Sequence, residues 1–457
     1  MRYRLALAIL ITSTASAQSN WEGADMPYLS FGVRQLYADT IVDQLLATGP
    51  IAIVNDFNTP VIANFKSGEW SYVQGFGGGG LYTSVRFGDT LVVGGYFHTL
   101  ADEPINLLAA WYDSTWHNFG QFPSEGVVRK LRVVNGDLYA VGSFHTVDGS
   151  VCHGVAKRVG GHWEGLGSID YPIGDEPIVL EVCEYQGNIV VGGEMNPIGL
   201  GNDLMQFDGT NWLDVGGGLL GGVGAVTCLA VYQNELYVGG GLYVGAGSPG
   251  HGLVRWNGSS WSDVGGSMRD IYGTTTYNAS ASSLLVHDGK LLVGGAFGYA
   301  GTLHANQFAI WDGSTWCATG DSIGGTVESM AFYHDTLFIA CTDSLDGQAV
   351  NYIGRWIGGV FEQVCEQVGI EELLEESVLP IGIGPLVSER RSLFGLPDGS
   401  VQLRVFDATG RLINSEVVVS SAGRALMHTG TPVPGMYVVE VISKTYRGVA
   451  RFVSTQD

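Results

Sequence analysis

The chain has 457 residues and carries 45 acidic against 22 basic side chains, which gives a formal net charge of −23. That charge repels phosphate backbones and argues against nucleic acid as a partner. The 69 glycines, set among many short apolar runs, favour strands and tight turns over helices.

The first 17 residues have the pattern of a secretory signal peptide. Arg2 and Arg4 precede an apolar run from Leu5 to Ile11, and Ala15-Ser16-Ala17 follows as a cleavage site. The run is too short for a membrane anchor, and no later stretch reaches the roughly 20 apolar residues that span a bilayer. We therefore expect a secreted or cell-surface protein whose mature chain begins at Gln18 and has no membrane span.

Without the two arginines of the signal peptide, the formal charge is 20 minus 45, or −25. This acidity suits a soluble extracellular protein, and carboxylate-rich loops would also suit Ca²⁺, the cofactor that the composition allows. The six cysteines form no CxxC pair and no zinc-type cluster with histidine, so the nature of any metal site is unknown at this stage. Cys183 and Cys228 are the first guess for a disulfide because they fall on the same strand of neighbouring repeats. Buried free thiols are the alternative.

Aromatic residues recur along the chain every 45 to 55 residues, which indicates a repeat architecture. Six of seven units keep a second aromatic residue five positions earlier, and Arg158 is the exception. The recurring positions are Trp70, Trp116, Trp163, Trp212, Trp261, Trp316 and Phe361.

Each unit contains four short apolar runs separated by glycine, aspartate and asparagine turns, most clearly in residues 282–318. Four hairpin-connected strands in a unit of this length are the size of one propeller blade. We therefore predict an all-β fold in which residues 29–365 form a seven-bladed β-propeller. Residues 18–28 repeat the motif around Trp21 and are predicted to supply a closing strand. Phe361 competes for this role, and the sequence does not decide between them.

A diglycine ends the second apolar run of several units, as at Gly94-Gly95 and Gly294-Gly295, and an aromatic pair follows it. This combination resembles the kelch repeat, including that of galactose-oxidase-type proteins. It is also similar to the propeller repeats of fungal cortical polarity-marker proteins. The resemblance implies a propeller, but kelch-like propellers serve adhesion, scaffolding and catalysis alike. Because the tryptophans follow the repeat, we interpret them as packing between sheets and not as a sugar-binding platform.

Function is expected on the longer and more variable loops. In an up-and-down blade, the loops between the second and third strands and those between blades emerge on one face, which we call the long-loop face. Carboxylates and tyrosines there would bind an extracellular glycan or protein, although any one of them could be an ordinary solvated side chain. The candidate ligand-binding residues are Asp102, Glu103, Asp170, Tyr171, Asp175, Glu176, Glu194, Tyr243, Tyr272 and Tyr277.

No catalytic signature accompanies these residues. The sequence has no GxSxG, HExxH, P-loop or dinucleotide motif, so no catalytic residue is proposed. His98 and His145 occupy matching places in two units, as do His153 and His251, which favours a structural role for all four. We expect a monomeric binding module. An enzyme that acts on extracellular polysaccharide and a purely structural surface protein are the alternatives.

Residues 366–399 begin with an acidic run and are predicted to be a linker, and residues 400–457 a small β-sandwich domain. Two segments of this domain, 405–411 and 434–441, resemble the type A sorting domain of type IX secretion. Asp407, Gly410, Arg411, Gly435 and Tyr437 stand at the motif positions. The resemblance implies the type IX machinery as a partner and passage across the outer membrane of a Bacteroidetes-type bacterium. A generic β-sandwich module is the alternative, because the usual Asn-Pro before the domain is replaced near Gly384-Pro385.

Overall fold

The computed structural model divides the chain into two compact units, Met1–Cys365 and Glu366–Asp457. It describes residues 20–24, 29–30, 32–53, 56–60, 62–73, 76–77, 79–100, 103–167, 169–172, 176–219, 223–244, 249–272, 275–319, 323–341, 344–345, 348–358, 382–387, 390–394, 396, 399–407, 412–422, 424–428, 435–442 and 447–454. These residues contain strands and turns but no helix, so the fold is all-β as predicted. Accordingly, none of them forms a helix with the length and apolarity to span a membrane. The predicted signal peptide lies outside the described residues.

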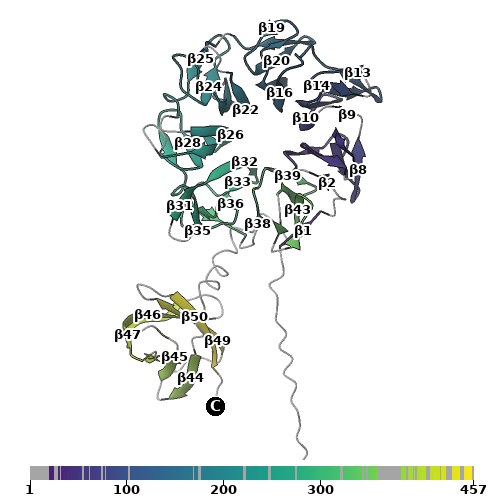
Figure 1. The fold of residues 1–457 in the computed structure, drawn as a ribbon. Helices are drawn as coiled ribbons and strands as arrows, with labels where there is room; N and C mark the ends of the chain where they lie inside the picture. The colour runs from purple at the N-terminus through teal and green to yellow at the C-terminus, as the bar shows by residue number, and fades with distance from the viewer. Residues whose placement is uncertain are drawn as a thin grey trace, which may run out of the picture. The chain divides into compact units, whose positions relative to one another are not determined.

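Seven of the four-stranded antiparallel sheets in the described part of the first unit recur along the chain, and we number them in chain order (Figure 1). An eighth four-stranded sheet is built from the longer connections and is not part of this series. Sheet 1 has β3 (Gln35–Asp39), β4 (Gln44–Thr48), β7 (Ile62–Lys66) and β8 (Glu69–Val73); sheet 2 has β10 (Gly80–Phe87), β11 (Thr90–Tyr96), β14 (Leu108–Tyr112) and β15 (Thr115–Asn118); sheet 3 has β16 (Val127–Val134), β17 (Asp137–Ser143), β20 (Val155–Val159) and β21 (His162–Gly165); sheet 4 has β22 (Ile178–Tyr185), β23 (Asn188–Glu194), β24 (Leu204–Phe207) and β25 (Trp212–Asp214). Sheet 5 has β26 (Val223–Tyr232), β27 (Glu235–Leu242), β28 (Leu253–Trp256) and β29 (Trp261–Asp263); sheet 6 has β32 (Ser280–His287), β33 (Lys290–Ala296), β36 (Phe308–Trp311) and β37 (Trp316–Cys317); sheet 7 has β39 (Ser329–Tyr333), β40 (Thr336–Ala340), β43 (Ile353–Trp356) and β1 (Trp21–Gly23).

The outer strand of sheet 7 comes from the start of the chain. β1 pairs with β43 in antiparallel register, with Trp21 opposite Trp356. The Trp21 segment therefore supplies this strand, which the sequence alone left open. Phe361, the competing candidate, lies outside the described residues.

The first strands of successive sheets lie against one another around the middle of the unit (Figure 1). β10 contacts β3 and β16, β26 contacts β22 and β32, and β39 contacts both β32 and β3. We call the contact between two successive sheets a seam and name it by its sheets, so that seam 7/1 joins β39 to β3.

Glycines permit the close approach of sheets at the seams. A Cβ on Gly94 would lie 2.5 Å from Cγ1 of Val128 in the next sheet, and a Cβ on Gly294 would lie 2.5 Å from Cγ1 of Val327. The second glycine of each pair faces a bulge in the first strand, because a Cβ on Gly95 would lie 2.2 Å from the Gly80 carbonyl oxygen. The diglycine is therefore required by packing on both sides of the strand.

Tryptophan side chains connect each sheet to the one before it. The indole Nε1 of Trp163 donates a 2.6 Å hydrogen bond to the Phe119 carbonyl, and Trp316 donates to Val264 at 3.1 Å. At seam 7/1, Trp70 donates to the Ala24 carbonyl at 2.7 Å. Trp21, Trp163, Trp212, Trp311 and Trp356 are buried, which confirms the predicted packing role for these five. Trp111 departs from it, because 37% of its surface is exposed.

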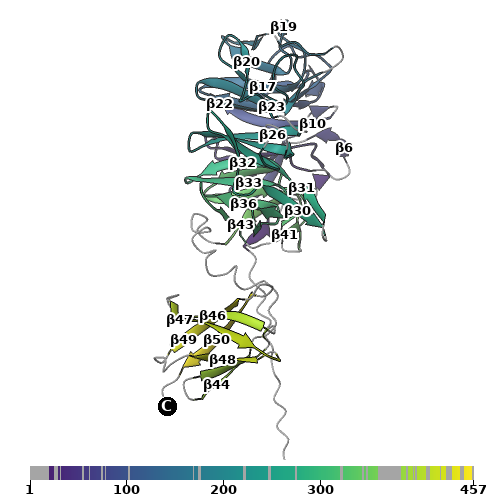
Figure 2. The ribbon, with the colours of Figure 1, turned by 90° about the vertical axis from the view of Figure 1, so that its left-hand side faces the viewer.

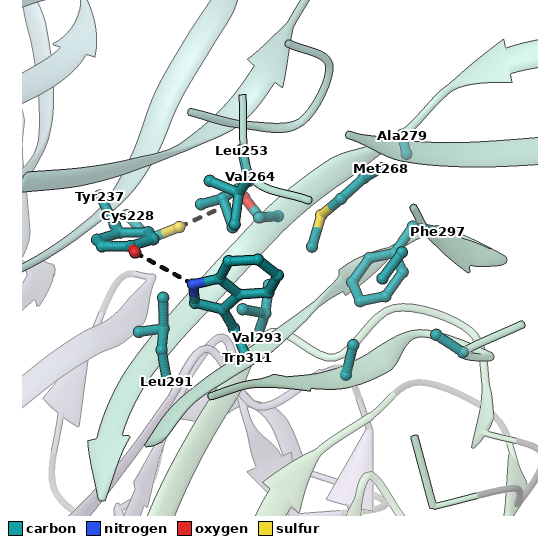
Figure 3. Close-up of a cluster of buried hydrophobic side chains, with 14 of the residues drawn as sticks. Cys228, Tyr237, Leu253, Val264, Met268, Ala279, Leu291, Val293, Phe297 and Trp311 are labelled. Carbon is teal, nitrogen blue, oxygen red and sulfur yellow. Dashed lines mark hydrogen bonds between the residues drawn. The ribbon is translucent and has the colours of Figure 1, made fainter. Parts of the chain in front are cut away.

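The packing at seam 5/6 shows how these side chains combine (Figure 3). The Trp311 indole points at the Tyr237 hydroxyl of sheet 5, at 3.2 Å. Leu253 and Val264 from sheet 5 and its following loop lie with Val293 of sheet 6 in the same buried cluster. Burying a tryptophan of this kind stabilises the fold by roughly 4 to 6 kcal/mol at 25 cal/mol/Å².

The longer connections build a second tier of small sheets on one face of the first unit. In sheets 1, 2, 6 and 7, a strand that precedes the first strand pairs with one from the connection between the second and third strands. These pairings confirm that both classes of long loop share a face, and Figure 2 shows β6, β30 and β31 along one side of the unit. The small sheets are β2 (Leu29–Ser30), β5 (Ala52–Ile53) and β6 (Asp56–Pro60); β9 (Phe76–Gly77), β12 (Thr99–Leu100) and β13 (Glu103–Pro104); β18 (Thr146–Val147) and β19 (Ser150–Val151); β30 (Met268–Tyr272), β31 (Thr275–Asn278), β34 (Tyr299–Ala300) and β35 (Leu303–His304); and β38 (Ile323–Gly324), β41 (Ser344–Leu345) and β42 (Gln348–Ala349).

The second unit has two antiparallel sheets that share one core. One is β44 (Gly382–Val387), β45 (Arg390–Phe394) and β48 (Arg424–His428), and the other is β47 (Leu412–Ser420), β46 (Gly399–Asp407), β49 (Gly435–Ile442) and β50 (Arg447–Ser454). The prediction of a linker through 366–399 is wrong for Gly382–Val387 and Arg390–Phe394, which form strands. Their alternation is hidden by Pro385 and by charged residues at 389–391, yet Leu393 is fully buried in the core.

Candidate functional site

The structure places the predicted ligand-binding residues at several separate positions on the loops. Glu103 on β13 and Glu194 at the end of β23 are exposed, and Tyr243 after β27 is half-buried. Tyr272 and Tyr277 lie on the paired strands β30 and β31, of which the backbone is described. Asp102 and Asp175 lie outside the described residues. The remaining three, Asp170, Tyr171 and Glu176, come together with two histidines.

These five residues form a group that we call the loop cluster: His145, His153, Asp170, Tyr171 and Glu176. His145 Nε2 lies 3.1 Å from Glu176 Oε1, and both side chains are more than half exposed. The His153 and Tyr171 ring centroids are 5.9 Å apart with the rings tilted by 41°. The cluster therefore presents a histidine–carboxylate pair beside a histidine–tyrosine pair.

Two connections hold the loop cluster in place. His145 and His153 flank the small hairpin β18–β19 of sheet 3, where the Cys152 N–H donates to the His145 carbonyl at 2.8 Å. Asp170, Tyr171 and Glu176 belong to the connection between sheets 3 and 4. The Asp170 carbonyl accepts a 2.8 Å hydrogen bond from the Ile198 N–H, which ties this connection to the loop after β23.

Electrostatics within the cluster favour a neutral His153. Burial lowers the pKa of His153, the neighbouring His145 lowers it further, and Asp170 opposes both effects. A neutral imidazole can donate one hydrogen bond and accept another, as a hydroxyl-bearing ligand requires. The described residues hold no group of three or more His, Cys, Asp or Glu side chains arranged for a metal ion.

Asp203 is a carboxyl that the sequence reasoning missed. Burial, with a contribution from the charge of Glu194, raises the pKa of Asp203 to about 6, while a hydrogen bond from the Met195 N–H opposes the shift. A raised carboxyl pKa beside a second carboxylate is the pattern of a glycosidase acid. The pattern would support the enzyme alternative if Asp203 had no other role.

The repeat supplies such a role. Asp203 and Gln307 occupy the same place before the third strand of sheets 4 and 6, with φ of 64° and 76°. The Asp203 side chain accepts from the Met195 N–H at 2.9 Å, and Gln307 Oε1 accepts from the Phe297 N–H at 2.7 Å. A neutral amide does the same work in sheet 6, so the carboxyl of Asp203 acts as a loop brace. Its raised pKa follows from burial.

Two surface clefts lie away from the long-loop residues. A cleft of about 470 Å³ at seam 7/1 is lined by residues that include Glu22, Phe65 and His334, and one of about 410 Å³ at seam 3/4 includes Asp137, Lys157 and Phe207. Both are bordered by the tight turns, and neither contains a predicted ligand-binding residue. The walls of the first are already paired, because Arg355 Nε donates to Glu22 at 2.6 Å.

The expected pairing of Cys183 with Cys228 is wrong. Both are unbridged thiols, as are Cys152 and Cys341, whereas Cys317 is disulfide-bonded. Burial raises the pKa of Cys228 to about 12, so this thiol stays neutral at physiological pH.

In the second unit, two of the sorting-motif segments lie side by side. β46 and β49 pair in register with Asp407 opposite Tyr437, and Tyr437 is buried in the core. Gly435 begins β49. Gly410 and Arg411 lie outside the described residues.

Neither the protein-family models nor the curated proteins include a match to the chain.

Proposed function

We propose that the first unit is a closed seven-bladed β-propeller of kelch type that binds an extracellular glycan or protein through its long-loop face. Closure is supported by seam 7/1, where the first strands of sheets 7 and 1 are in contact and the Trp70 indole donates to the Ala24 carbonyl. Radial closure of the sheets leaves only short, protected sheet edges, which limits aggregation.

The observation that carries the binding role is the loop cluster. His145 and Glu176 are exposed, and they carry opposite charges when His145 is protonated. They lie with the neutral His153 and the Tyr171 ring on loops that the sheets of the first unit hold in place. The small sheets that cover the long-loop face of sheets 1, 2, 6 and 7 have no counterpart over sheets 4 and 5 among the described residues. The cluster lies beside this region, because its residues come from sheet 3 and from the connection between sheets 3 and 4.

Binding of the mature chain, residues 18–457, to a glycan array with and without Ca²⁺ tests this function. The double variant His145→Ala/Glu176→Ala should lose at least about tenfold in affinity for any glycan that the array identifies, equal to about 1.4 kcal/mol. The matched control is His287→Ala/Asp288→Ala, because this pair has a similar separation of 3.3 Å and lies at a tight turn, with side-chain exposures of 29% and 52%. Equal losses in both variants, or no glycan or metal bound at all, would contradict the proposal.

We propose further that the second unit is a β-sandwich sorting domain of the type IX system and that residues 1–17 direct export. The pairing of the two motif strands supports this role, since residues of both segments then form one surface. Deletion of residues 366–457 should leave the protein in the periplasm, as cell fractionation would reveal. Normal surface display of the truncated chain would refute the sorting role and leave the binding proposal untouched.

A further inference from the structure

A group of three charged side chains at seam 3/4 is not balanced in charge. Lys130 and Arg132 on β16 face Glu181 on β22. Arg132 binds the carboxylate through two nitrogens, with Nε to Oε1 at 2.8 Å and NH2 to Oε2 at 2.9 Å, and Lys130 Nζ lies 3.4 Å from Oε2. Two cations therefore share one carboxylate, which is only 3% exposed.

Other seams show that a structural link between sheets does not require this excess. Neutral side chains do the work where Ser329 accepts from the Leu36 N–H and Thr83 accepts from the Leu131 N–H. Where ions are used at seam 1/2, Arg86 meets the buried Asp39 one to one. Arg132 and Glu181 alone would complete the same one-to-one arrangement, so Lys130 is a surplus cation.

The surplus has a cost because Glu181 is buried and Lys130 is only 21% exposed, so much of this charge group lies out of water. Burying a charge without a full set of opposite charges costs several kcal/mol in proteins. Burial lowers the pKa of Lys130, and Glu181 offsets this effect only in part. The neighbouring thiols supply no second negative charge, because burial raises the pKa of both Cys183 and Cys228.

The two cations remain open to solvent. The side chain of Arg132 is 42% exposed and that of Lys130 is 21% exposed, although both belong to first strands in the middle of the unit (Figure 1). A small anion can therefore reach them without displacing Glu181. The planar guanidinium and the point charge of the ammonium both suit oxygen anions.

We propose that Lys130 and Arg132 bind an oxyanion, the sulfate or carboxylate group of a small ligand, as the fourth member of this charge group. The ligand restores a balance of two positive and two negative charges and favours the protonated form of Lys130. This site is separate from the loop cluster and does not depend on the binding role proposed for it.

Isothermal titration calorimetry of the mature chain tests the site, with sodium sulfate and sodium glucuronate as probes and with sodium chloride at matched ionic strength. The first probe represents sulfate esters and the second represents sugar carboxylates, so the stronger ligand identifies the source. Both measurements use affinity and not melting temperature, because sulfate stabilises folded proteins without binding a site.

Lys130→Gln should weaken the affinity for the stronger-binding probe at least about tenfold, or about 1.4 kcal/mol, while leaving the Arg132–Glu181 pair in place. Lys130→Arg should retain binding, since the charge is kept. The matched control Lys157→Gln removes a lysine from the same sheet that pairs with Asp137 at 2.7 Å, and it should bind like the unaltered chain. Saturable binding to neither probe, or the same affinity in Lys130→Gln as in the unaltered chain, would overturn the proposal.

Discussion

Replacing the Asp203 carboxyl by an amide should stabilise the first unit at neutral pH. The carboxyl is buried and has a pKa of about 6 instead of its usual 3.8, so its ionised form is disfavoured in the folded state. The folded chain holds this proton more tightly than the unfolded chain does. The stability that the protonated Asp203 carboxyl contributes is therefore complete below about pH 4 and is lost as the pH rises through about 6. The difference between the two pKa values corresponds to about 3 kcal/mol.

Asp203→Asn keeps an acceptor oxygen for the Met195 N–H, as Gln307 does at the matching place in sheet 6. We expect the variant to unfold at higher urea concentration at about pH 7.5, with a gain of up to about 3 kcal/mol, and to match the unaltered chain near pH 4. Tryptophan fluorescence reports the first unit selectively, because all 11 tryptophans precede residue 366.

Asp113→Asn is the control, since that side chain is exposed in a tight turn of sheet 2, and it should change the free energy of unfolding at about pH 7.5 by less than about 0.5 kcal/mol. A loss of stability in Asp203→Asn at neutral pH would refute the brace interpretation. It would show that the charged carboxylate itself is needed and would favour the enzyme alternative for Asp203.

Three further predictions concern the seams and the thiols. Glu181→Gln should lower the free energy of urea unfolding at neutral pH by about 3 to 5 kcal/mol, because it leaves two cations without a carboxylate. The control Glu235→Gln removes the more exposed partner of Arg255 and should lower the free energy of unfolding by less than about 1 kcal/mol. Burial opposes ionisation of Glu181, but Arg132 and Lys130 outweigh it and hold the pKa of Glu181 at about 2. The stability that the ionised Glu181 contributes is therefore present above about pH 4.5 and is lost as the pH falls toward 2. Glu181→Gln should accordingly lose less stability than the unaltered chain over this acid range. Gly294→Ala should lower the free energy of unfolding by about 1 to 3 kcal/mol, because the new Cβ clashes with Val327. In the control Gly32→Ala, the new Cβ meets nothing within 4 Å, and the free energy of unfolding should change by less than about 0.5 kcal/mol. Equal effects of the two substitutions would refute the packing argument. Thiol titration of the denatured, unreduced protein should count four thiols, from Cys152, Cys183, Cys228 and Cys341, and a count of two would show an additional disulfide.

The strands and tight turns could be predicted because their signals are local. Turns such as Asn135-Gly136 adopt positive φ at both residues, which is the geometry that the Asn-Gly sequence favours in a hairpin. The role of Trp21 was suggested by its motif but could not be decided, since pairing with residues far along the chain leaves no local trace. Pro385 and nearby charges concealed the first two strands of the second unit.

The residues of the candidate site were only partly predictable. Asp170, Tyr171 and Glu176 were identified from their loop, whereas His145 and His153 were assigned to the scaffold because similar histidines recur in other repeats. Their partners come from a different connection, and a repeat comparison cannot show which neighbour a loop meets. Glu181 was missed for a related reason: a single carboxylate within an apolar strand gives no sign of the two cations on the preceding sheet.

The pairing of β1 with β43 also bears on the order in which the first unit can assemble. The strand that completes sheet 7 is made first and meets a partner 335 residues later, from Trp21 to Trp356. Joining such distant segments carries a length-dependent entropic cost of about 5 kcal/mol, and it can occur only after nearly the whole unit has been synthesised. A nascent chain that emerges from the ribosome therefore cannot complete sheet 7 until β43 has been made, so β1 waits without its partner while the sheets between them form.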